Sequence, residues 1–414
     1  MQDQSRYAVG IDIGTTEVRC VVGHIDSTNG VPTIVGVGHA PNSGMRKGIV
    51  VNLNGPAQAI DKTLGEAERM SGYEVNEATI SINGSHIVST KADGMVAVGM
   101  ADREVVAEDV QRVEEVATVG KIPPNREILE VIPFGYTIDG QSGIKDPIGM
   151  SGTRLEIVAS VVSAMTPYVE NIRKAAEMAT VRSRAVVPAV MAAARAVLTE
   201  SQIESGVAVI DIGGATTSVA VFEEGDLQYV GVVPYGGVNI TNDLAIGLKV
   251  DPSIAEKVKL SHAVASGRKD SEGVSMKNDK EILTFQTSDI DEIVEARLEE
   301  IFDHVNKELK KAGRSGQLPS GVVLVGGSAN LKGITDFART HLGVAARVGK
   351  PTGFGGVADG VDTPQYAAAV GLMLADAEMV PQNHFGGKGG KKAVSAGAKK
   401  ARGLMGTIFG YLKP

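Results

Sequence analysis

Short runs of β-branched residues alternate with stretches of helical apolar spacing along most of the chain. Tyr7–Ile11 and Val18–Val22 are two such runs, and the tight Asp-Ile-Gly-Thr-Thr sequence between them predicts a β-hairpin. Pro56–Ser71 instead repeats its apolar residues at helical spacing, and Gly72 follows as a typical helix stop. Strands interleaved with helices predict an α/β fold.

The same patterns predict further elements up to about residue 380. A strong amphipathic helix is expected from a cap at Ser288 to a stop at Gly313. Further strands are expected at Thr33–Gly38, Thr79–Ile82, Arg184–Val187 and Val322–Val325, and further helices at Ala107–Val119, Pro167–Ala179, Pro188–Leu198 and Tyr366–Leu374.

The first hairpin pattern returns in the second half of the chain. Val207–Ile210 and Ser218–Phe222 are joined by Asp-Ile-Gly-Gly-Ala-Thr-Thr, which begins 199 residues after its counterpart. A pattern that recurs in this way indicates a duplicated unit. A chain of 414 residues also exceeds one ordinary core. We therefore expect two lobes of the same kind.

Changes in composition divide the chain further. Residues 84–163 are rich in Gly, Pro and β-branched residues around one polar helix, which indicates an inserted subdomain. Residues 381–399 are rich in Gly, Lys and Ala without periodicity, as flexible linkers are. The predicted divisions are 1–83 with 164–204 and 360–380 for the first lobe core, 84–163 for the inserted subdomain, 205–240 with 318–359 for the second lobe core, 241–317 for its small subdomain, 381–399 for the linker and 400–414 for a terminal helix.

The two glycine-containing turns have the chemistry of phosphate-binding sites. Glycine lets backbone N–H groups approach phosphate oxygens closely, threonine hydroxyls add donors, and an aspartate at the strand end can hold the hydrated Mg²⁺ that accompanies nucleoside triphosphates. One such turn is equally consistent with an ordinary hairpin, whereas two in repeated lobes would clamp phosphates from both sides of a cleft. The candidate residues are Asp12, Gly14, Thr15 and Thr16 in the first turn, and Asp211, Gly213, Gly214, Thr216 and Thr217 in the second, with Asp12 and Asp211 as Mg²⁺ ligands through water.

A third glycine turn follows an apolar strand near the end of the second lobe. Gly326, Gly327, Ser328 and Ala329 permit the close approach of a flat base or ribose. The alternative is a helix start with a tight turn. The Gly-rich segment 386–392 has no strand before it and no helix after it, so we reject it as a phosphate loop.

In this order the three turns resemble those of the superfamily of actin, heat-shock chaperone ATPases and sugar kinases. Within it, the chain resembles the FtsA family of bacterial cell-division proteins through residues 133–141 and 143–155 of the insertion, and through 82–86 and 234–237. The resemblance covers roughly residues 7–380 and the terminal helix. It implies an actin-like fold of two duplicated, ribonuclease H-like lobes with an inserted subdomain in the first lobe, and ATP with Mg²⁺ as the ligand.

The resemblance adds candidate nucleotide contacts in the second lobe. Gly236 and Gly237 end a matching Pro-Tyr-Gly-Gly segment. Glu256 and Lys259 look like residues of the helix that contacts the adenosine in bacterial actins. The alternative for this pair is an ordinary ion pair at helical spacing.

Hydrolysis of ATP needs a group that orients or deprotonates the attacking water. In related ATPases a glutamate precedes a Pro-x-Ala-Ala-type segment, but Val187 precedes Pro188 in this chain. We therefore expect slow or negligible ATP turnover, with the nucleotide acting as a conformational and assembly switch, and we assign no catalytic residue. The alternative function is a small-molecule kinase of the same fold, which would need a substrate pocket and an aspartate base.

The resemblance also implies protein partners. The C-terminal tail of the tubulin-like protein FtsZ is expected to bind the small subdomain of the second lobe, at Arg297 and Asn306. Arginine suits the acidic tail of that family. The alternative for Arg297 is a surface ion pair with Glu300 or with the acids beside Ile293. Actin-like self-assembly, and docking of later division proteins on the inserted subdomain, are implied as well.

Charge is distributed unevenly along the chain. The formal net charge is −8, but residues 1–378 contain 34 basic and 49 acidic residues, a net charge of −15, whereas seven basic residues and no acidic ones follow from Met379 onward. So acidic a body argues against a nucleic-acid partner, and the basic tail suits anionic membrane lipids.

The terminal segment has an amphipathic pattern. A helix over residues 400–412 would place five large apolar side chains within an arc of about 140°, with basic residues at its ends, which indicates a helix lying in the lipid headgroup region. The alternative is docking on this protein or on a partner. A lone Cys20, a polar N-terminus and no membrane-spanning run indicate a cytosolic main body. The resemblance to the FtsA family implies a peripheral protein on the cytoplasmic side of the bacterial inner membrane, at the division site. The membrane-facing candidates are Leu404, Met405, Ile408, Phe409 and Leu412.

Overall fold

The structure is a computed structural model that describes residues 6–379, apart from 26–29, 100–102, 267, 269, 279–280 and 357–359. The predicted linker and amphipathic terminal helix lie outside the described residues. Within the described part, no helix is both long enough and apolar enough to cross a membrane.

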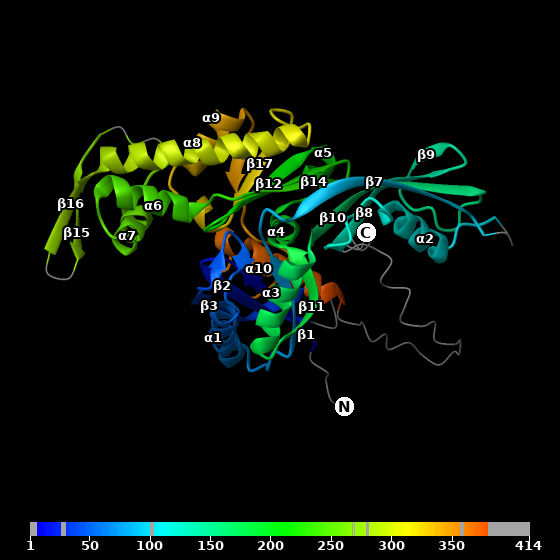
Figure 1. Ribbon diagram of the computed structural model, residues 1–414, viewed down its shortest axis with the longest axis horizontal. Helices are drawn as coiled ribbons and strands as arrows, with labels where there is room; N and C mark the ends of the chain where they lie inside the picture. The colour runs from blue at the N-terminus through cyan, green and yellow to red at the C-terminus, as the bar shows by residue number, and fades with distance from the viewer. Residues whose placement is uncertain are drawn as a thin grey trace.

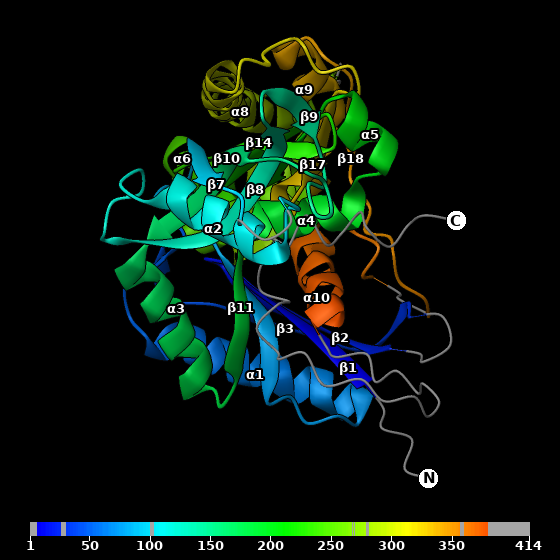
Figure 2. The same ribbon diagram turned by 90° about the vertical axis from the view of Figure 1, so that its right-hand side faces the viewer.

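The first lobe is built on a five-stranded sheet with helices on both faces (Figure 2). The sheet has the order β11-β6-β1-β2-β3, in which β1 pairs antiparallel with β2 and parallel with β6. Helix α1 (Asn54–Ser71) ends at Gly72 in the left-handed conformation, as predicted. The strands are β1 (Arg6–Ile13), β2 (Glu17–Ile25), β3 (Pro32–Pro41), β6 (Glu77–Ile82) and β11 (Arg182–Pro188).

Glycines let the covering helices lie close to this sheet. A Cβ on Gly38 of β3 would lie 2.0 Å from the carbonyl oxygen of Thr63 in α1, and one on Gly10 of β1 would lie 2.3 Å from that of Ala369 in α10 (Ala367–Met379). Gly10 and Gly38 face opposite sides of the pleat, so α1 and α10 cover opposite faces. α3 (Thr166–Met178) packs beside α1, and α4 (Ala189–Val197) packs against α10.

The second lobe repeats this plan. Its sheet has the order β14-β13-β12-β17-β18, with three antiparallel strands followed by two parallel ones, as in the first lobe. The buried helix α4 also contacts β12 and β13, so it joins the two lobes. The predicted duplicated α/β architecture of two lobes is therefore confirmed. The strands are β12 (Val207–Ile212), β13 (Thr217–Glu223), β14 (Asp226–Val233), β17 (Val322–Val325) and β18 (Ala346–Val348).

The insertion in the first lobe has its own four-stranded sheet and its own core (Figure 1). α2 (Ala107–Thr118) covers one face of this sheet, and β7 reaches the second lobe, where the Ser89 hydroxyl accepts the Val230 N–H at 2.9 Å. Its strands, whose positions the sequence patterns did not predict, are β7 (Val88–Ala97), β8 (Arg126–Ile138), β9 (Gln141–Ile144) and β10 (Arg154–Met165).

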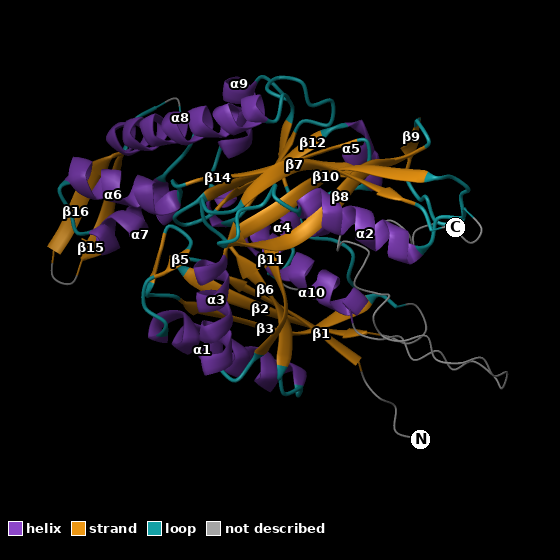
Figure 3. Ribbon diagram, turned by 45° about the vertical axis from the view of Figure 1, so that its right-hand side comes forward, coloured by secondary structure: helices purple, strands orange, loops and turns teal. Residues whose placement is uncertain are grey.

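The small subdomain of the second lobe lies at the far end of the molecule from the insertion (Figure 3). Its long helix α8 (Thr287–Lys311) ends before Gly313, which has the expected positive φ of 71°. The predicted cap at Ser288 is wrong, because α8 begins at Thr287, directly after strand β16, and Gln286 holds the N-cap position without a side-chain bond. The other elements are α6 (Gly237–Leu248), α7 (Pro252–His262), and the unpredicted hairpin β15 (Gly273–Asn278) and β16 (Glu281–Gln286).

The remaining short elements connect these parts. They are β4 (Met45–Arg46), β5 (Ile49–Val50), α5 (Glu200–Ser205), α9 (Ile334–Leu342), and the 3₁₀ helices η1 (Gly327–Asn330) and η2 (Pro364–Tyr366).

Candidate nucleotide site

The two predicted phosphate turns are equivalent hairpin tips. In the β1–β2 tip the Gly14 N–H donates to the Glu17 carbonyl at 3.0 Å, and in the β12–β13 tip the Gly213 N–H donates to the Thr216 carbonyl at 2.9 Å. Asp12 stands opposite Arg19 in one ladder, as Asp211 stands opposite Ser218 in the other. The duplication therefore extends to the closing hydrogen bond of each tip.

The two tips lie against each other where the lobes meet. A Cβ on Gly214 of the second tip would lie 2.6 Å from the hydroxyl oxygen of Thr16 in the first, and 2.7 Å from its methyl carbon. Only a glycine allows so close an approach. The tips thus lie side by side where the lobes meet, and their binding of phosphate stays a prediction.

Side chains of the first lobe hold its tip in place. Ser81 accepts the Ile13 N–H and donates to an Asp12 carboxylate oxygen, each at 2.8 Å. The Asn42 side chain donates to the Gly14 carbonyl at 2.7 Å, and the Asn42 N–H donates to the Thr16 carbonyl at 2.8 Å. The first lobe therefore fixes both tip carbonyls.

The two aspartates are close enough to influence each other electrostatically. Burial raises the pKa of Asp12, and the hydrogen bond from Ser81 opposes this shift. Burial, with the negative charge of Asp12 as the second cause, raises the pKa of Asp211 to about 7. A divalent cation would favour the ionised form of both carboxylates.

These donors suit Mg²⁺ better than a metal held mainly by protein side chains. No group of three or more His, Cys, Asp or Glu side chains in the described residues is arranged to bind a metal. Mg²⁺ keeps several waters and commonly uses only one or two carboxylates together with substrate phosphates. Asp12 and Asp211 would therefore hold it through water.

The start of α6 packs on the second tip. The Gly237 N–H donates to the Gly213 carbonyl at 3.0 Å, and the Val238 N–H donates to the Gly214 carbonyl at 2.7 Å. A Cβ on Gly236 would lie 2.5 Å from the same Gly213 oxygen. Gly236 and Gly237 are thus brought to the predicted site, where their lack of side chains permits this packing.

The Glu256–Lys259 pair lies beside this helix start. The two side chains form an ion pair at 2.7 Å, which was the alternative interpretation of their spacing. The Lys259 ammonium also donates to the Gly237 carbonyl at 3.1 Å and to the Thr241 hydroxyl at 2.8 Å. The pair is therefore both an ordinary helical ion pair and a neighbour of the other candidates.

The third turn also reaches the site. A Cβ on Gly326, whose φ is 86°, would lie 2.4 Å from a carboxylate oxygen of Asp211, and one on Gly237 would lie 2.6 Å from the Ser328 hydroxyl. Gly327 is exposed on η1, whereas Ala329 is buried. The glycine at 326 is required both by its positive φ and by the nearness of Asp211.

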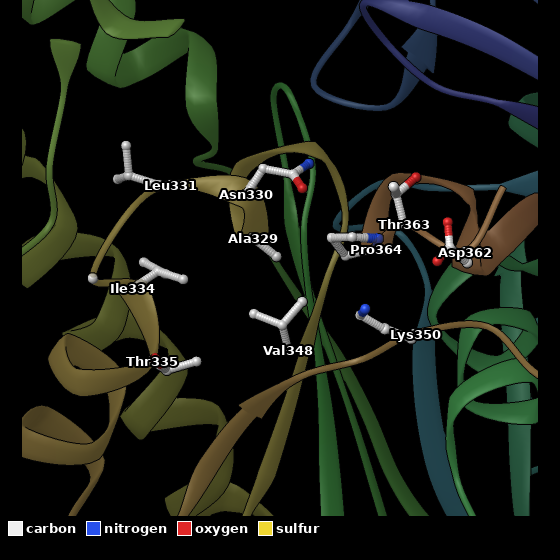
Figure 4. Close-up of a pocket in the computed structure, with 11 residues that line it drawn as sticks. Ala329, Asn330, Leu331, Ile334, Thr335, Val348, Lys350, Asp362, Thr363 and Pro364 are labelled. Carbon is white, nitrogen blue, oxygen red and sulfur yellow. The ribbon is translucent and has the colours of Figure 1, made fainter. Parts of the chain in front are cut away.

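Ala329 lines a cavity of about 390 Å³ (Figure 4). Leu331, Ile334 and Val348 line it together with Lys350 and others, but neither the hairpin tips nor the Glu256–Lys259 pair contribute to its lining. The cavity therefore borders the third turn, through Ala329 and through Pro364, whose carbonyl accepts the Gly326 N–H at 2.9 Å.

Thr217 does not match its predicted role. Its side chain is fully buried, and its hydroxyl donates to the Tyr235 carbonyl at 2.9 Å. The hydroxyl thus fixes the segment that precedes α6 and is not presented to a ligand. Thr216 is also buried and closes the tip through its backbone, while Thr15 and Thr16 are at least partly exposed.

Sequence reasoning missed several residues around the tips. Ser81, Asn42 and Lys47 all belong to the first lobe, and no motif distinguishes them. The Lys47 ammonium lies 5.8 Å from the ring centre of Tyr235 in the second lobe.

The expected partner residues lie on α8. Arg297 forms ion pairs with Asp243 of α6 and with Glu300, the second of which was the alternative interpretation. Asn306 is half-buried and accepts a hydrogen bond from the Ser315 hydroxyl at 2.6 Å. The membrane-facing candidates of the terminal helix lie outside the described residues.

Comparison with protein families identifies the chain. A family model described as "Cell division protein FtsA" matches residues 208–371, and one described as "SHS2 domain inserted in FTSA" matches residues 84–163. The FtsA protein of Neisseria meningitidis serogroup B is 36% identical over 382 residues, which cover 91% of each chain. That of Pseudomonas aeruginosa is 35% identical over 373 residues, covering 89% of each. The chain belongs to the FtsA family.

Solved structures of other proteins show how far the fold of this FtsA-family chain is shared. The PilM–PilN type IV pilus biogenesis complex aligns with a TM-score of 0.63 at 18% identity, over 89% of this chain and 98% of that one. MreB5 of Spiroplasma citri bound to ADP aligns with a TM-score of 0.55 at 12% identity, over 90% and 97%. The MamK double helical filament aligns with a TM-score of 0.51 at 12% identity, over 91% and 100%. At such identities the likeness establishes the actin-like fold alone.

Proposed function

We propose that this protein binds ATP with Mg²⁺ between its lobes, assembles into actin-like polymers at the cytoplasmic membrane, anchors FtsZ filaments there and recruits later division proteins. The observation that carries the nucleotide part is the contact between the tips at Thr16 and Gly214, since it brings two anion-binding turns to one place. The family assignment carries the cell-division part.

The chemistry around the tips supports a polyphosphate ligand. Each tip contains glycine, Gly14 in the first and Gly213 with Gly214 in the second, and turns of this kind can bring backbone N–H groups close to phosphate oxygens. Asp12 and Asp211 supply carboxylates for hydrated Mg²⁺. Lys259 and Ser328, beside the start of α6, supply polar groups for the nucleoside.

Slow turnover, with the nucleotide as an assembly switch, is part of the proposal. Val187, at the position where related ATPases carry a glutamate, is buried in β11 and has no group that can orient water. Rapid ATP consumption with one particular small metabolite would instead favour the kinase alternative.

The membrane part rests on the sequence of the tail. Burial of each large apolar side chain among Leu404, Met405, Ile408, Phe409 and Leu412 contributes about 1.5–3 kcal/mol before entropy costs. Each nearby basic residue adds about 1 kcal/mol on an anionic leaflet. Together these contributions favour stable but peripheral attachment.

Liposome flotation tests the combined proposal. With Mg-ATP, the full chain is expected to float with anionic liposomes, to carry FtsZ with it and to form polymers visible by electron microscopy. A chain without residues 400–414 is expected to bind ATP normally and to remain in the unbound fraction. Equal flotation of the two chains would refute membrane attachment through the tail, and absence of nucleotide binding by both would refute the site.

A further inference from the structure

The turn between β4 and β5 has an unusual conformation. Arg46 pairs with Ile49, so Lys47 and Gly48 are the two central residues of the hairpin. Both have positive φ, 50° for Lys47 and 79° for Gly48. This conformation suits Gly, Asn or Asp, whereas lysine has no short polar side chain to favour it. Strained residues of this kind cluster at functional sites.

The turn is fixed to the first phosphate tip. The Gly48 N–H donates to the Thr15 hydroxyl oxygen at 3.0 Å. On its other side Gly48 packs on the backbone of residues 83–84, where a Cβ would lie 2.8 Å from the Gly84 nitrogen. The residue that follows Lys47 is therefore hydrogen-bonded to Thr15, a residue of the proposed phosphate site.

The side chain of Lys47 reaches toward the other lobe. Its ammonium lies 5.8 Å from the ring centre of Tyr235, within the range of a cation–π contact. Tyr235 immediately precedes Gly236 and Gly237, and its carbonyl accepts the Thr217 hydroxyl of the second tip. Lys47 therefore lies between the turn that is bonded to the first tip and the segment that is bonded to the second tip.

The charges near the tips leave Lys47 available for an anion. Arg19 is ion-paired with Glu17, and Lys259 is ion-paired with Glu256. Lys47 is exposed and has no carboxylate within ion-pair distance among the described residues. A polyphosphate brought beside Asp12 and Asp211 adds further negative charge, which a nearby ammonium stabilises.

We propose that Lys47 is a phosphate ligand of the nucleotide site, and that its ammonium links the two lobes across the bound polyphosphate. The proposal rests on the proposed nucleotide binding and adds a residue to it. It predicts that Lys47 contributes to affinity for nucleotides in proportion to their phosphate charge and contributes nothing to affinity for the nucleoside.

Calorimetric titration of the full chain with Mg-ATP, Mg-ADP and adenosine tests this role. We expect Lys47→Gln to weaken ATP binding at least tenfold, to weaken ADP binding less, and to leave adenosine binding unchanged. Lys47→Arg, which keeps the charge, should retain ATP affinity within about threefold of the wild type. The matched control is Arg46→Gln, which removes the same charge from the same turn and should stay within about twofold.

The outcomes separate the two proposals. If the wild type binds ATP and Lys47→Gln binds it equally well, the role of Lys47 is refuted while the proposed function stands. An equal loss in Arg46→Gln would also refute it, because the effect would then be one of general charge. If the wild type binds no nucleotide, both proposals fall. Thermal unfolding of each variant without nucleotide should match that of the wild type, since Lys47 and Arg46 are exposed.

Discussion

Thr16, at the tip of the first hairpin, lies directly against Gly214, at the tip of the second. The two tips are equivalent by topology but not by chemistry. At the point of contact the first tip presents a side chain and the second presents bare backbone. This asymmetry lets the lobes approach closely at this point.

Gly214→Ala is expected to weaken Mg-ATP binding about tenfold, or ~1.4 kcal/mol, in calorimetric titration. The added Cβ would lie 2.6 Å from the Thr16 hydroxyl oxygen and would force the tips apart. Adding Thr16→Ala should recover part of the loss, because the nearest remaining Thr16 atom lies 3.3 Å away. Gly65→Ala in α1 is the matched control, since a Cβ there meets nothing within 4 Å. Wild-type affinity in Gly214→Ala would contradict the close contact.

Asp376→Ala is expected to lower the free energy of unfolding by about 2–5 kcal/mol, because it leaves the buried Val9 N–H and Thr79 hydroxyl without an acceptor. Asp376 of α10 is fully buried and accepts from the Val9 N–H at 2.9 Å, the Thr79 hydroxyl at 2.7 Å and Arg184 at 2.5 Å. Asp376→Asn should cost less, since it retains a carbonyl acceptor. Urea denaturation measures both.

The control for this comparison is Asp336→Ala in α9. Asp336 forms an exposed ion pair with Arg339, and such pairs contribute at most about 1 kcal/mol. If the losses at residues 376 and 336 were equal, Asp376 would not be the buried link between α10 and the first-lobe sheet.

The stability of the inserted subdomain should fall as pH rises from about 4.5 to 7. Burial raises the pKa of Glu114 to about 7, above its ordinary 4.5, and its carboxylate accepts from the Tyr136 hydroxyl at 3.2 Å. The folded state therefore binds more protons than the unfolded state in this window, and ionisation favours unfolding. Glu114→Gln should flatten this dependence in denaturation experiments at pH 5 and pH 7.5.

Glu115→Gln is the control for the pH experiment, because Glu115 is the exposed neighbour on the same helix. It should leave the slope of stability against pH unchanged. The same slope in Glu114→Gln and in the wild type would show that another group titrates in this range.

Arg297→Glu is expected to abolish FtsZ recruitment while ATP affinity persists, as measured by co-flotation and calorimetry. The variant also places a carboxylate beside Asp243 and Glu300, so Arg297→Gln is the cleaner test. Asp243→Asn frees the guanidinium from its internal partner and should preserve or strengthen FtsZ binding. Equal losses in Arg297→Gln and Asp243→Asn would mean that Arg297 only joins α6 to α8.

Several features of the fold could be predicted from local sequence. Gly72 and Gly313 mark helix ends because a positive φ is a property of one residue. Both phosphate turns could be recognised because a tight hairpin is specified by a few adjacent residues. The strands of the insertion and the β15–β16 hairpin could not, since their pairing depends on partners elsewhere in the chain.

The sequence by itself determined the duplicated hairpins, the glycines at their tips and the order of the lobes, because these depend on short-range backbone chemistry. Only the tertiary structure decided how individual side chains are used. In the folded chain the Thr217 hydroxyl donates to the Tyr235 carbonyl, and Arg297 forms an ion pair with Asp243. Ser81 donates to the Asp12 carboxylate, and the Lys47 ammonium lies near the ring of Tyr235 in the second lobe. Each of these contacts joins residues from different elements, and packing of the whole chain selects them.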